Sequence, residues 1–475
     1  MRHGTGVYRF GAFELHPTTG RLLREGQPVA ISDSAFAILV HLVAHAPDVA
    51  RKETLTRVGW RGIASTGSLE QAISRLRKAL GHVNGLTLIE TVPNRGYRFA
   101  GSVEEVHVED ATTPDGLERD VFHLFVKARR RLASFTTGGI AEARCGFAQV
   151  IAAAPNYAPA HIGMSTSCAL AFDATRVATA CDVEALTQAI EHGLRSVAFA
   201  PASGDAWSAL GFARYLAGES DEGMAAAVKA VALEPGSWRH ALRLGYVSWG
   251  EERLEAADTA LSLRPRLAMA YWLKATVFIA RGAFDAALAQ LHDGCAAQDD
   301  QPAQDAAYPA VGLHLLRGLV LAARGLLDAA IGELEAELSV SDRRQIYWQE
   351  CAANSWYALG GIRLRLRDFT KADAAFRRAL EIAPGHLLSM AALGRPLPEL
   401  PLRDHRLFDL RLAQVVSLVR ENRHADAARA CAAMLAHAPG PGAGWLLPVE
   451  PILSVSVRPA IWSTVLAVVQ ARATA

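Results

Sequence analysis

Residues 68–99 read SLEQAISRLRKALGHVNGLTLIETVPNRGYRF, and this stretch decides the fold of the first hundred residues. Its first part carries apolar residues at spacings of four, three and four, which form one face of a helix: Leu69, Ile73, Leu76 and Leu80. The sequence therefore predicts a helix over about 69–80, which Gly81 ends. The segments 86–91 and 97–101 flank the turn sequence Pro93-Asn94-Arg95-Gly96 and predict a β-hairpin with arginine at its tip.

The residues upstream predict a small antiparallel sheet and two further helices. Short alternating segments at 7–10, 13–16, 21–24 and 28–31 are separated by turn residues. Ser32 is a candidate N-cap for a helix over 33–46, and a second helix follows over about 51–58. A loop over 61–67, which contains glycine and serine, leads into the third helix.

The polar side of the third helix carries side chains that can read bases. A helix can enter the major groove of DNA when its exposed face offers hydrogen-bond donors to base edges. Arg75 can bond guanine O6 and N7 in bidentate fashion, Gln71 can read adenine, and Ser74 can contact a base or a phosphate. A structural alternative stays open for Gln71, because Ser68 and Gln71 also form an S-x-x-Q capping box.

Three other cations suit the phosphate backbone. Arg77 and Lys78 lie near the end of the same helix, and Arg95 at the hairpin tip can enter a narrow minor groove or clamp the backbone. The alternative for Arg77 is an ion pair with Glu70 or Glu90, and the whole polar face can also be an ordinary solvated surface.

These residues resemble a known family, the OmpR-type winged helix-turn-helix domain, over residues 7–101. The resemblance is carried by Phe10-Gly11, by 55–60, by AISRLRKAL at 72–80 and by ETVPNRGYRF at 90–99. It implies that the third helix is the recognition helix and the hairpin is the wing. It also places Gln71, Ser74 and Arg75 at base-facing positions, and Ser68, Arg77 and the wing near the phosphates. The loop at 61–67 would contact RNA polymerase.

Two features depart from the family pattern. Many members have arginine at the wing position that Pro93 occupies here, so we expect Arg95 to take over its role. Only six residues precede the first predicted strand, so we expect no receiver domain and no activation by aspartyl phosphate. The order, with the winged helix first and helical repeats after it, is similar to that of CadC/ToxR/HilA-like regulators.

The rest of the chain predicts helical repeats. WYALGGIRLRLRDFTKADAAFRRALEIAP places residues in register with a 34-residue helix-turn-helix signature, namely Trp356, Leu359, Gly360, Ala372, Phe376, Ala379 and Pro384. A second copy runs from Trp207 to Pro235, and degenerate units cover 270–295 and 311–338. These are tetratricopeptide (TPR) positions, so we expect nearest-neighbour stacking into a superhelix with a concave surface. The Gly/Pro stretch 439–444 is interpreted as a loop between repeats.

The predicted fold class is thus multidomain, with an α+β winged helix followed by an all-α TPR-like superhelix. The expected boundaries are 1–101 for the DNA-binding domain, 102–118 for an acidic linker and 119–475 for the repeats. Charge follows the same division. Residues 1–104 hold 13 Lys/Arg and 8 Asp/Glu, whereas the remainder holds 36 and 40, so only the first part favours a polyanion.

Composition also bears on compartment and chemistry. The six cysteines include no pair closer than 13 residues, which excludes zinc-knuckle spacing and suits free thiols in a reducing cytoplasm. We find no signal peptide and no apolar run long enough for a membrane span, so a cytoplasmic protein is expected. No P-loop, dinucleotide, zinc-protease or nucleophile-elbow motif is present, so we expect no cofactor, no metal and no enzyme activity.

The sequence therefore predicts a sequence-specific transcription regulator that binds double-stranded DNA. Its helical region would bind a protein or peptide partner, pair with a second copy in a homodimer, or sense a signal. The competing hypothesis is a TPR scaffold that uses its winged helix for protein contacts. Salt dependence separates the two, because counterion release makes DNA affinity fall steeply with salt.

Overall fold

The computed structural model describes residues 7–17, 20–24, 27–29, 31–60, 66–83, 86–93, 95–106, 117–175, 177–299, 312–339, 343–400, 405–438 and 440–474. The chain divides into two compact units, residues 1–126 and 127–475. The boundary falls within α4 (Arg119–Leu132). Each unit is described by itself below.

The first unit contains a five-stranded antiparallel sheet in the order β4-β3-β2-β1-β9. Its strands are β1 (Val7–Phe10), β2 (Phe13–His16), β3 (Arg21–Arg24), β4 (Gln27–Pro28) and β9 (Glu104–Val106). Alternation sets the faces, because Tyr8 pairs with Leu15 on the buried side while Arg9 and Glu14 form an ion pair of 2.9 Å at the surface.

Strand β9 lies inside the stretch that the sequence predicts as a linker, and this part of the prediction is wrong. Residues 104–106 pair antiparallel with β1, with Val7 opposite Val106 and Arg9 opposite Glu104. The sheet edge at β1 offers unpaired backbone groups, and a returning segment satisfies them whatever its side-chain charge.

Three helices pack on this sheet: α1 (Asp33–Ala44), α2 (Lys52–Trp60) and α3 (Thr66–Leu80). Ser32 is the N-cap of α1 as predicted, and its side chain accepts a hydrogen bond from the Ala35 amide. Apolar residues of all three helices share one core with the sheet, among them Ile38, Leu55 and Leu76, each fully buried.

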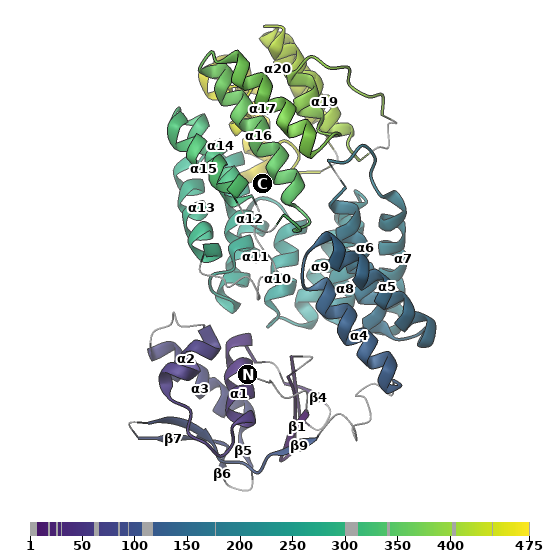
Figure 1. Cartoon of the computed structure of the whole chain (residues 1–475), viewed down its shortest axis with the longest axis vertical. Helices are drawn as coiled ribbons and strands as arrows, with labels where there is room; N and C mark the ends of the chain where they lie inside the picture. The colour runs from purple at the N-terminus through teal and green to yellow at the C-terminus, as the bar shows by residue number, and fades with distance from the viewer. Residues whose placement is uncertain are drawn as a thin grey trace. The chain divides into compact units, whose positions relative to one another are not determined.

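Two short hairpins follow α3, where the sequence predicts one. Strands β5 (His82–Val83) and β6 (Leu86–Thr87) form the first, and β7 (Ile89–Val92) and β8 (Gly96–Phe99) form the second, which is the wing. Leu88 separates them because its side chain turns into the core, where it is 4% exposed, and its carbonyl accepts from the Ala100 amide. Figure 1 shows the wing on the side of the helices away from the five-stranded sheet.

The second unit is all helix. After α4 come α5 (Thr137–Ala153), α6 (Ala158–Asp173), α7 (Val183–Phe199), α8 (Gly204–Leu216), α9 (Ser220–Leu233), α10 (Trp238–Val247), α11 (Gly250–Leu263), α12 (Ala268–Ala280), α13 (Phe284–Asp299), α14 (Leu313–Ala323), α15 (Leu327–Ser339), α16 (Trp348–Arg365), α17 (Phe369–Ile382), α18 (Leu387–Ala392), α19 (Leu407–Arg420), α20 (His424–Ala436) and α21 (Pro459–Thr474). Two 3-10 helices, η1 (Leu447–Val449) and η2 (Val455–Val457), precede α21.

Consecutive helices pack as antiparallel pairs from α6/α7 to α16/α17, and the two predicted repeats are α8/α9 and α16/α17. The signature glycines let the paired helices approach. A Cβ on Gly360 would lie 2.3 Å from the ring of Phe376, and a Cβ on Gly211 would lie 2.8 Å from the carbonyl oxygen of Gly223. Small residues occupy these positions because a larger side chain would clash with the paired helix.

First helices of successive pairs also contact one another, as α6 does with α8, α8 with α10, α10 with α12, and α14 with α16. In the described part of the chain, the second helices of neighbouring pairs do not pack against one another to a comparable extent. Elements on the inside of a curved stack lie closer together than those outside, so the first helices line the concave side.

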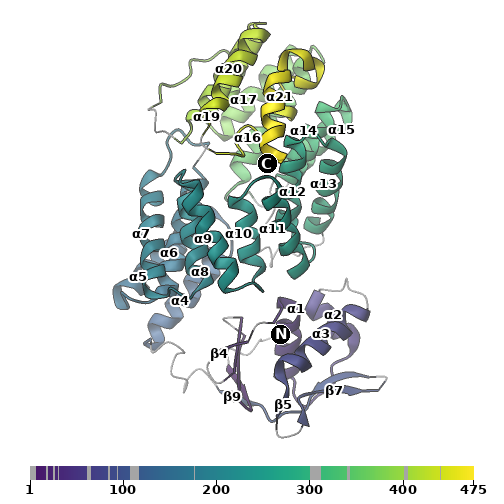
Figure 2. The same ribbon diagram turned by 180° about the vertical axis from the view of Figure 1, so that it is seen from behind.

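The stack departs from simple nearest-neighbour order at two places. The α6–α7 connection reaches the residues around α16–α19, where Arg406 donates to the carbonyls of Ala178 and Thr179 at 3.2 and 2.7 Å. Residues 440–474 form no further repeat, so the predicted repeat region ends at α20. Figure 2 shows α21, in yellow, near α12 and α20. Among the described residues, no helix has both the length and the apolarity that a membrane crossing requires.

Candidate nucleic-acid interface

Helix α3 presents one polar face to solvent. Gln71, Ser74, Arg75 and Lys78 are exposed, and Ser68 on the same side is half-buried. The opposite side holds the buried residues Leu69, Ile73, Leu76 and Leu80. The helical period that anchors the apolar side in the core thus points five of the predicted site residues outward together.

The start of α3 removes one alternative. The helix begins at Thr66, so Ser68 lies inside it and cannot be its N-cap. The capping-box explanation of Gln71 is therefore wrong, and the Gln71 side chain is exposed. Residues 61–65 of the predicted polymerase loop lie outside the described residues, and its last two residues belong to α3.

Arg77 occupies the border between the polar and apolar sides and points to the wing. Its Nε donates to the Ile89 carbonyl at 2.9 Å, and its Nη2 donates to the Thr91 hydroxyl at 2.8 Å. Its guanidinium carbon also lies 6.0 Å from the centroid of the Tyr97 ring. These contacts join the C-terminal end of α3 to both strands of the wing.

The two carboxylates offered as alternative partners of Arg77 have other partners. Glu70 binds Lys52 of α2 at 3.2 Å, and Glu90 binds Arg98 across the wing at 2.9 Å. The alternative explanation of Arg77, an ion pair with Glu70 or Glu90, is therefore not what the structure shows. Because each carboxylate next to the polar face is matched by a cation, the face keeps the positive charge of its own basic residues.

The wing tip is held by backbone contacts. The Arg95 amide donates to the Val92 carbonyl at 3.1 Å and closes the turn, and the Arg95 side chain is exposed. Tyr97 exchanges two backbone hydrogen bonds with Ala50, of 2.8 and 3.0 Å, which tie the wing to the α1–α2 connection. A shallow groove between α3 and β7 is lined by Arg77, Thr87, Ile89, Glu90 and Thr91.

Thr91 is the residue that sequence reasoning missed. Its hydroxyl faces α3 and accepts a hydrogen bond from the Arg77 guanidinium. The pairing of Thr91 with Tyr97 in the hairpin register is the only sequence-level signal for it, and that register follows from the turn at 93–96.

One group in the second unit has ligand atoms close enough for a metal: Asp205, Glu234 and His240 lie within 4.8 Å of one another. Glu234 uses one oxygen to accept from the Gly204 amide at 2.8 Å and the other to contact His240 Nε2 at 3.1 Å. This arrangement caps the start of α8, because the carboxylate satisfies an amide that has no partner within the helix.

Two family models match the chain. Residues 26–99 match the family described as transcriptional regulatory protein, C terminal, and residues 353–386 match the tetratricopeptide repeat. No protein with a curated description matches it.

Three solved structures are similar to parts of the chain. The DNA-binding domain of CadC from E. coli is 28% identical, with 21% of this chain and 97% of that chain covered and a TM-score of 0.20. The RstA DNA-binding domain of Klebsiella pneumoniae, in complex with the RstA box, is 34% identical, with coverage of 20% and 96% and a TM-score of 0.18. A tetratricopeptide repeat protein from Parabacteroides merdae is 12% identical, with coverage of 58% and 98% and a TM-score of 0.41.

Proposed function

Because residues 26–99 form an OmpR-type domain of the transcriptional regulatory protein family and a TPR-like region follows, we propose that the protein is a sequence-specific transcription regulator. The TPR-like region binds a protein or peptide partner, or a second copy of the chain, and conveys a signal to the DNA-binding unit. The TPR-like region is acidic, whereas the first hundred residues are basic. This difference in charge favours DNA contact at the winged helix and disfavours it at the TPR-like region.

The observation that carries this proposal is the exposed polar face of α3. Arg75 is exposed in the middle of that face and makes no hydrogen bond or ion pair with another described residue. It supplies the main base discrimination, bidentate to guanine, while Gln71 and Ser74 read neighbouring positions. Ser68 and Lys78 contact phosphates, and Arg95 contacts the backbone or the minor groove.

Arg77 takes a different role from the one its charge predicts. With two donors used on Ile89 and Thr91, it is a positioning residue that sets the wing against α3. The resemblance to the OmpR-type family further supports contact between the 61–67 loop and RNA polymerase.

The test begins with selection of an operator from a random duplex pool by the full chain. Affinities are then measured for the selected duplex and for a scrambled one. We expect Arg75→Ala to weaken binding to the selected duplex by about 10- to 100-fold, the value of a good bidentate pair, and to change scrambled binding far less. Lys78→Ala should weaken both equally and lower the salt slope by about one.

Arg21→Ala is the matched control, because Arg21 is an exposed arginine on β3 of the same unit. It should leave both affinities unchanged. Equal losses on the two duplexes for Arg75→Ala would remove Arg75 from base readout. A full chain without duplex affinity at low salt would instead support the scaffold hypothesis.

A further inference from the structure

The concave side of the second unit is occupied by the chain's own segment 440–458, which we call the C-terminal strap. Its 3-10 helix η1 contacts α12 and α14. Pro451 lies against Gly361 of α16, where an added Cβ would be 2.7 Å from the proline ring. The strap thus crosses the first helices of three successive pairs, the surface that repeat proteins of this kind use for binding.

An aromatic contact anchors the start of the strap. The rings of Trp445 and of Trp272 on α12 pack edge to face, with centroids 6.0 Å apart and planes at 76°. Gly442 lies against Trp249, where an added Cβ would come within 2.9 Å of the indole. Large aromatic side chains set into a neighbouring surface are the usual anchors of a protein interface.

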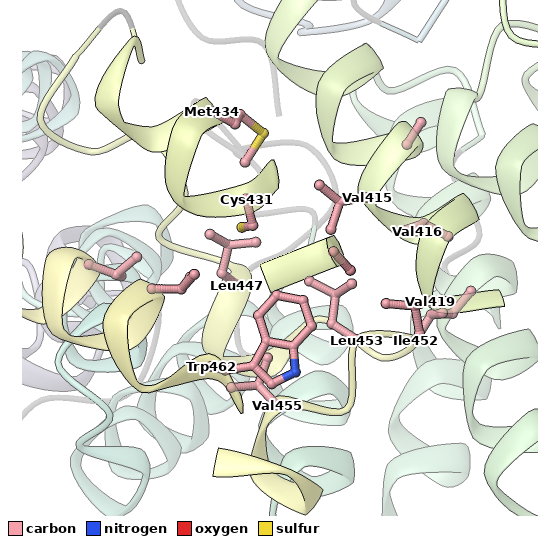
Figure 3. Packing of buried hydrophobic residues seen from close by; sticks show 14 of the residues in the cluster. Val415, Val416, Val419, Cys431, Met434, Leu447, Ile452, Leu453, Val455 and Trp462 are labelled. Carbon is pink, nitrogen blue, oxygen red and sulfur yellow. The ribbon is translucent and has the colours of Figure 1, made fainter. Parts of the chain in front are cut away.

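Further along, the strap buries aliphatic side chains. Leu447, Leu453 and Val455 are at most 3% exposed. Figure 3 shows them grouped around the indole of Trp462 on α21, in the same cluster as Val415 and Val416 of α19. The strap therefore meets the stack as an apolar peptide built of turns and two 3-10 helices.

One carboxylate is buried at the centre of this contact. Glu450 is 5% exposed, accepts a hydrogen bond from the Tyr357 hydroxyl of α16, and accepts another from the Leu453 amide. Burial raises the pKa of Glu450 to about 7, and it also raises the pKa of the facing Cys431 thiol to about 12. The groove thus has a fixed polar position, opposite Tyr357, that recognises a carboxyl group.

Two features distinguish the contact from a permanent core. The strap begins with a Gly- and Pro-rich sequence, GPGAG at 440–444, and contains no helix longer than three residues among the described positions. In addition, the indole nitrogen of Trp249, whose ring contacts Gly442 of the strap, is buried without a hydrogen-bond partner in the described residues. Settled cores rarely leave such groups unsatisfied, because each costs about 1–3 kcal/mol.

We propose that the strap is an intramolecular ligand of the concave groove, and that a partner segment of the same chemistry binds the helical unit by displacing it. That chemistry is a short apolar peptide without regular α-helix or β-strand, with an aromatic anchor and one carboxylate. The proposal rests on the proposed function of the helical unit in partner binding. Tethering gives the strap an effective concentration in the millimolar range, so the groove stays closed until a partner competes.

The test uses the full chain and a fluorescein-labelled peptide with the sequence of residues 440–458. Fluorescence anisotropy should show no saturable binding to the wild-type chain. The double variant Trp445→Ala/Leu447→Ala weakens the strap and leaves the groove intact, so it should bind the peptide saturably at concentrations at least tenfold below the highest at which wild type shows no binding. Addition of Trp272→Ala removes the partner of the aromatic anchor and should abolish that gain.

A double variant with the wild-type circular dichroism spectrum that ignores the peptide would overturn the proposal. If the variant does not fold, hydrogen exchange on the wild-type chain decides. Strap amides should exchange at least tenfold faster than those of α12 and α16, and equal protection would identify the strap as permanent core. Duplex affinity, measured on the same samples, reports separately on the proposed DNA-binding function.

Discussion

At the scale of single residues, Arg77 links α3 to the wing. Its two hydrogen bonds reach a carbonyl and a hydroxyl on β7, so its removal leaves the Ile89 carbonyl without a side-chain donor. Because Arg77 is only half-buried and its bond to Thr91 is exposed, the two bonds together contribute about 1–2 kcal/mol, which is about 5- to 30-fold in a local opening equilibrium. This free energy stabilises the position of the wing against α3, and it does not require a DNA contact.

We therefore expect Arg77→Ala to raise hydrogen exchange of the β7 and β8 amides by about 5- to 30-fold and to weaken duplex binding. Lys78→Ala, the adjacent exposed cation, should weaken duplex binding and leave wing exchange unchanged. If Arg77→Ala weakened duplex binding without faster wing exchange, Arg77 would be a direct phosphate contact.

Helical spacing suffices to predict the outward side chains of this site. The positions of Leu69, Ile73 and Leu76 place Gln71 and Arg75 on the opposite side of α3. The same reasoning does not settle Arg77, which lies at the border of the two sides. Its acceptors are a backbone carbonyl and a hydroxyl on another element, and neither leaves a charge pattern in the sequence.

At the scale of elements, the wing depends on one glycine. Gly96 has φ +141°, and an added Cβ would lie 2.0 Å from the carbonyl oxygen of Ala50. Both the backbone conformation and the close approach require glycine there. Gly81, which follows α3, also has positive φ, at +63°, yet a Cβ there would meet nothing within 4 Å.

These two glycines make a matched pair. Gly81→Ala should lower the free energy of unfolding by about 1 kcal/mol, which is the penalty of placing alanine in a left-handed conformation alone. Gly96→Ala should cost about 3 kcal/mol or more, because it separates the wing from the α1–α2 connection and breaks the Ala50–Tyr97 hydrogen bonds. Hydrogen exchange of the Ala50 and Tyr97 amides measures the difference between the two variants, expected to be about 30-fold or more. Similar protection in the two variants would contradict the steric argument.

Elements with a regular period are predictable from this sequence, and elements defined by a distant partner are not. The strands at 7–10, 13–16 and 21–24 and the repeat pairs α8/α9 and α16/α17 follow from alternation and from the 34-residue signature. Strand β9 is hidden in an acidic stretch because its partner β1 is about a hundred residues away. The strap is hidden for the same reason, since its partners lie on α12, α14 and α16.

At the scale of the whole molecule, the second unit is closed by contacts between its first and later helices. The Thr137 amide donates to the Arg344 carbonyl at 3.0 Å, and the Tyr347 hydroxyl donates to Asp173 at 2.7 Å. Arg406, 7% exposed, adds its bonds to the α6–α7 connection. An open solenoid is approximately a sum of neighbouring units, whereas these bonds couple helices that are far apart in the chain.

Because these contacts join the first helices of the unit to later ones, we expect α5–α7 and α16–α19 to open together in hydrogen exchange. Arg406→Ala removes the bonds to the carbonyls of Ala178 and Thr179, and hydrogen bonds from a charged donor contribute about 1.5–3 kcal/mol. We expect exchange in α6 and α7 to rise by about 10- to 150-fold, while α12 and α13, away from the closing contacts, keep their protection. Arg423→Ala is the control, because the ion pairs of Arg423 with Glu421 and Asp426 are local and exposed. Faster exchange confined to α19 in Arg406→Ala would show that the first and later helices of this unit open independently.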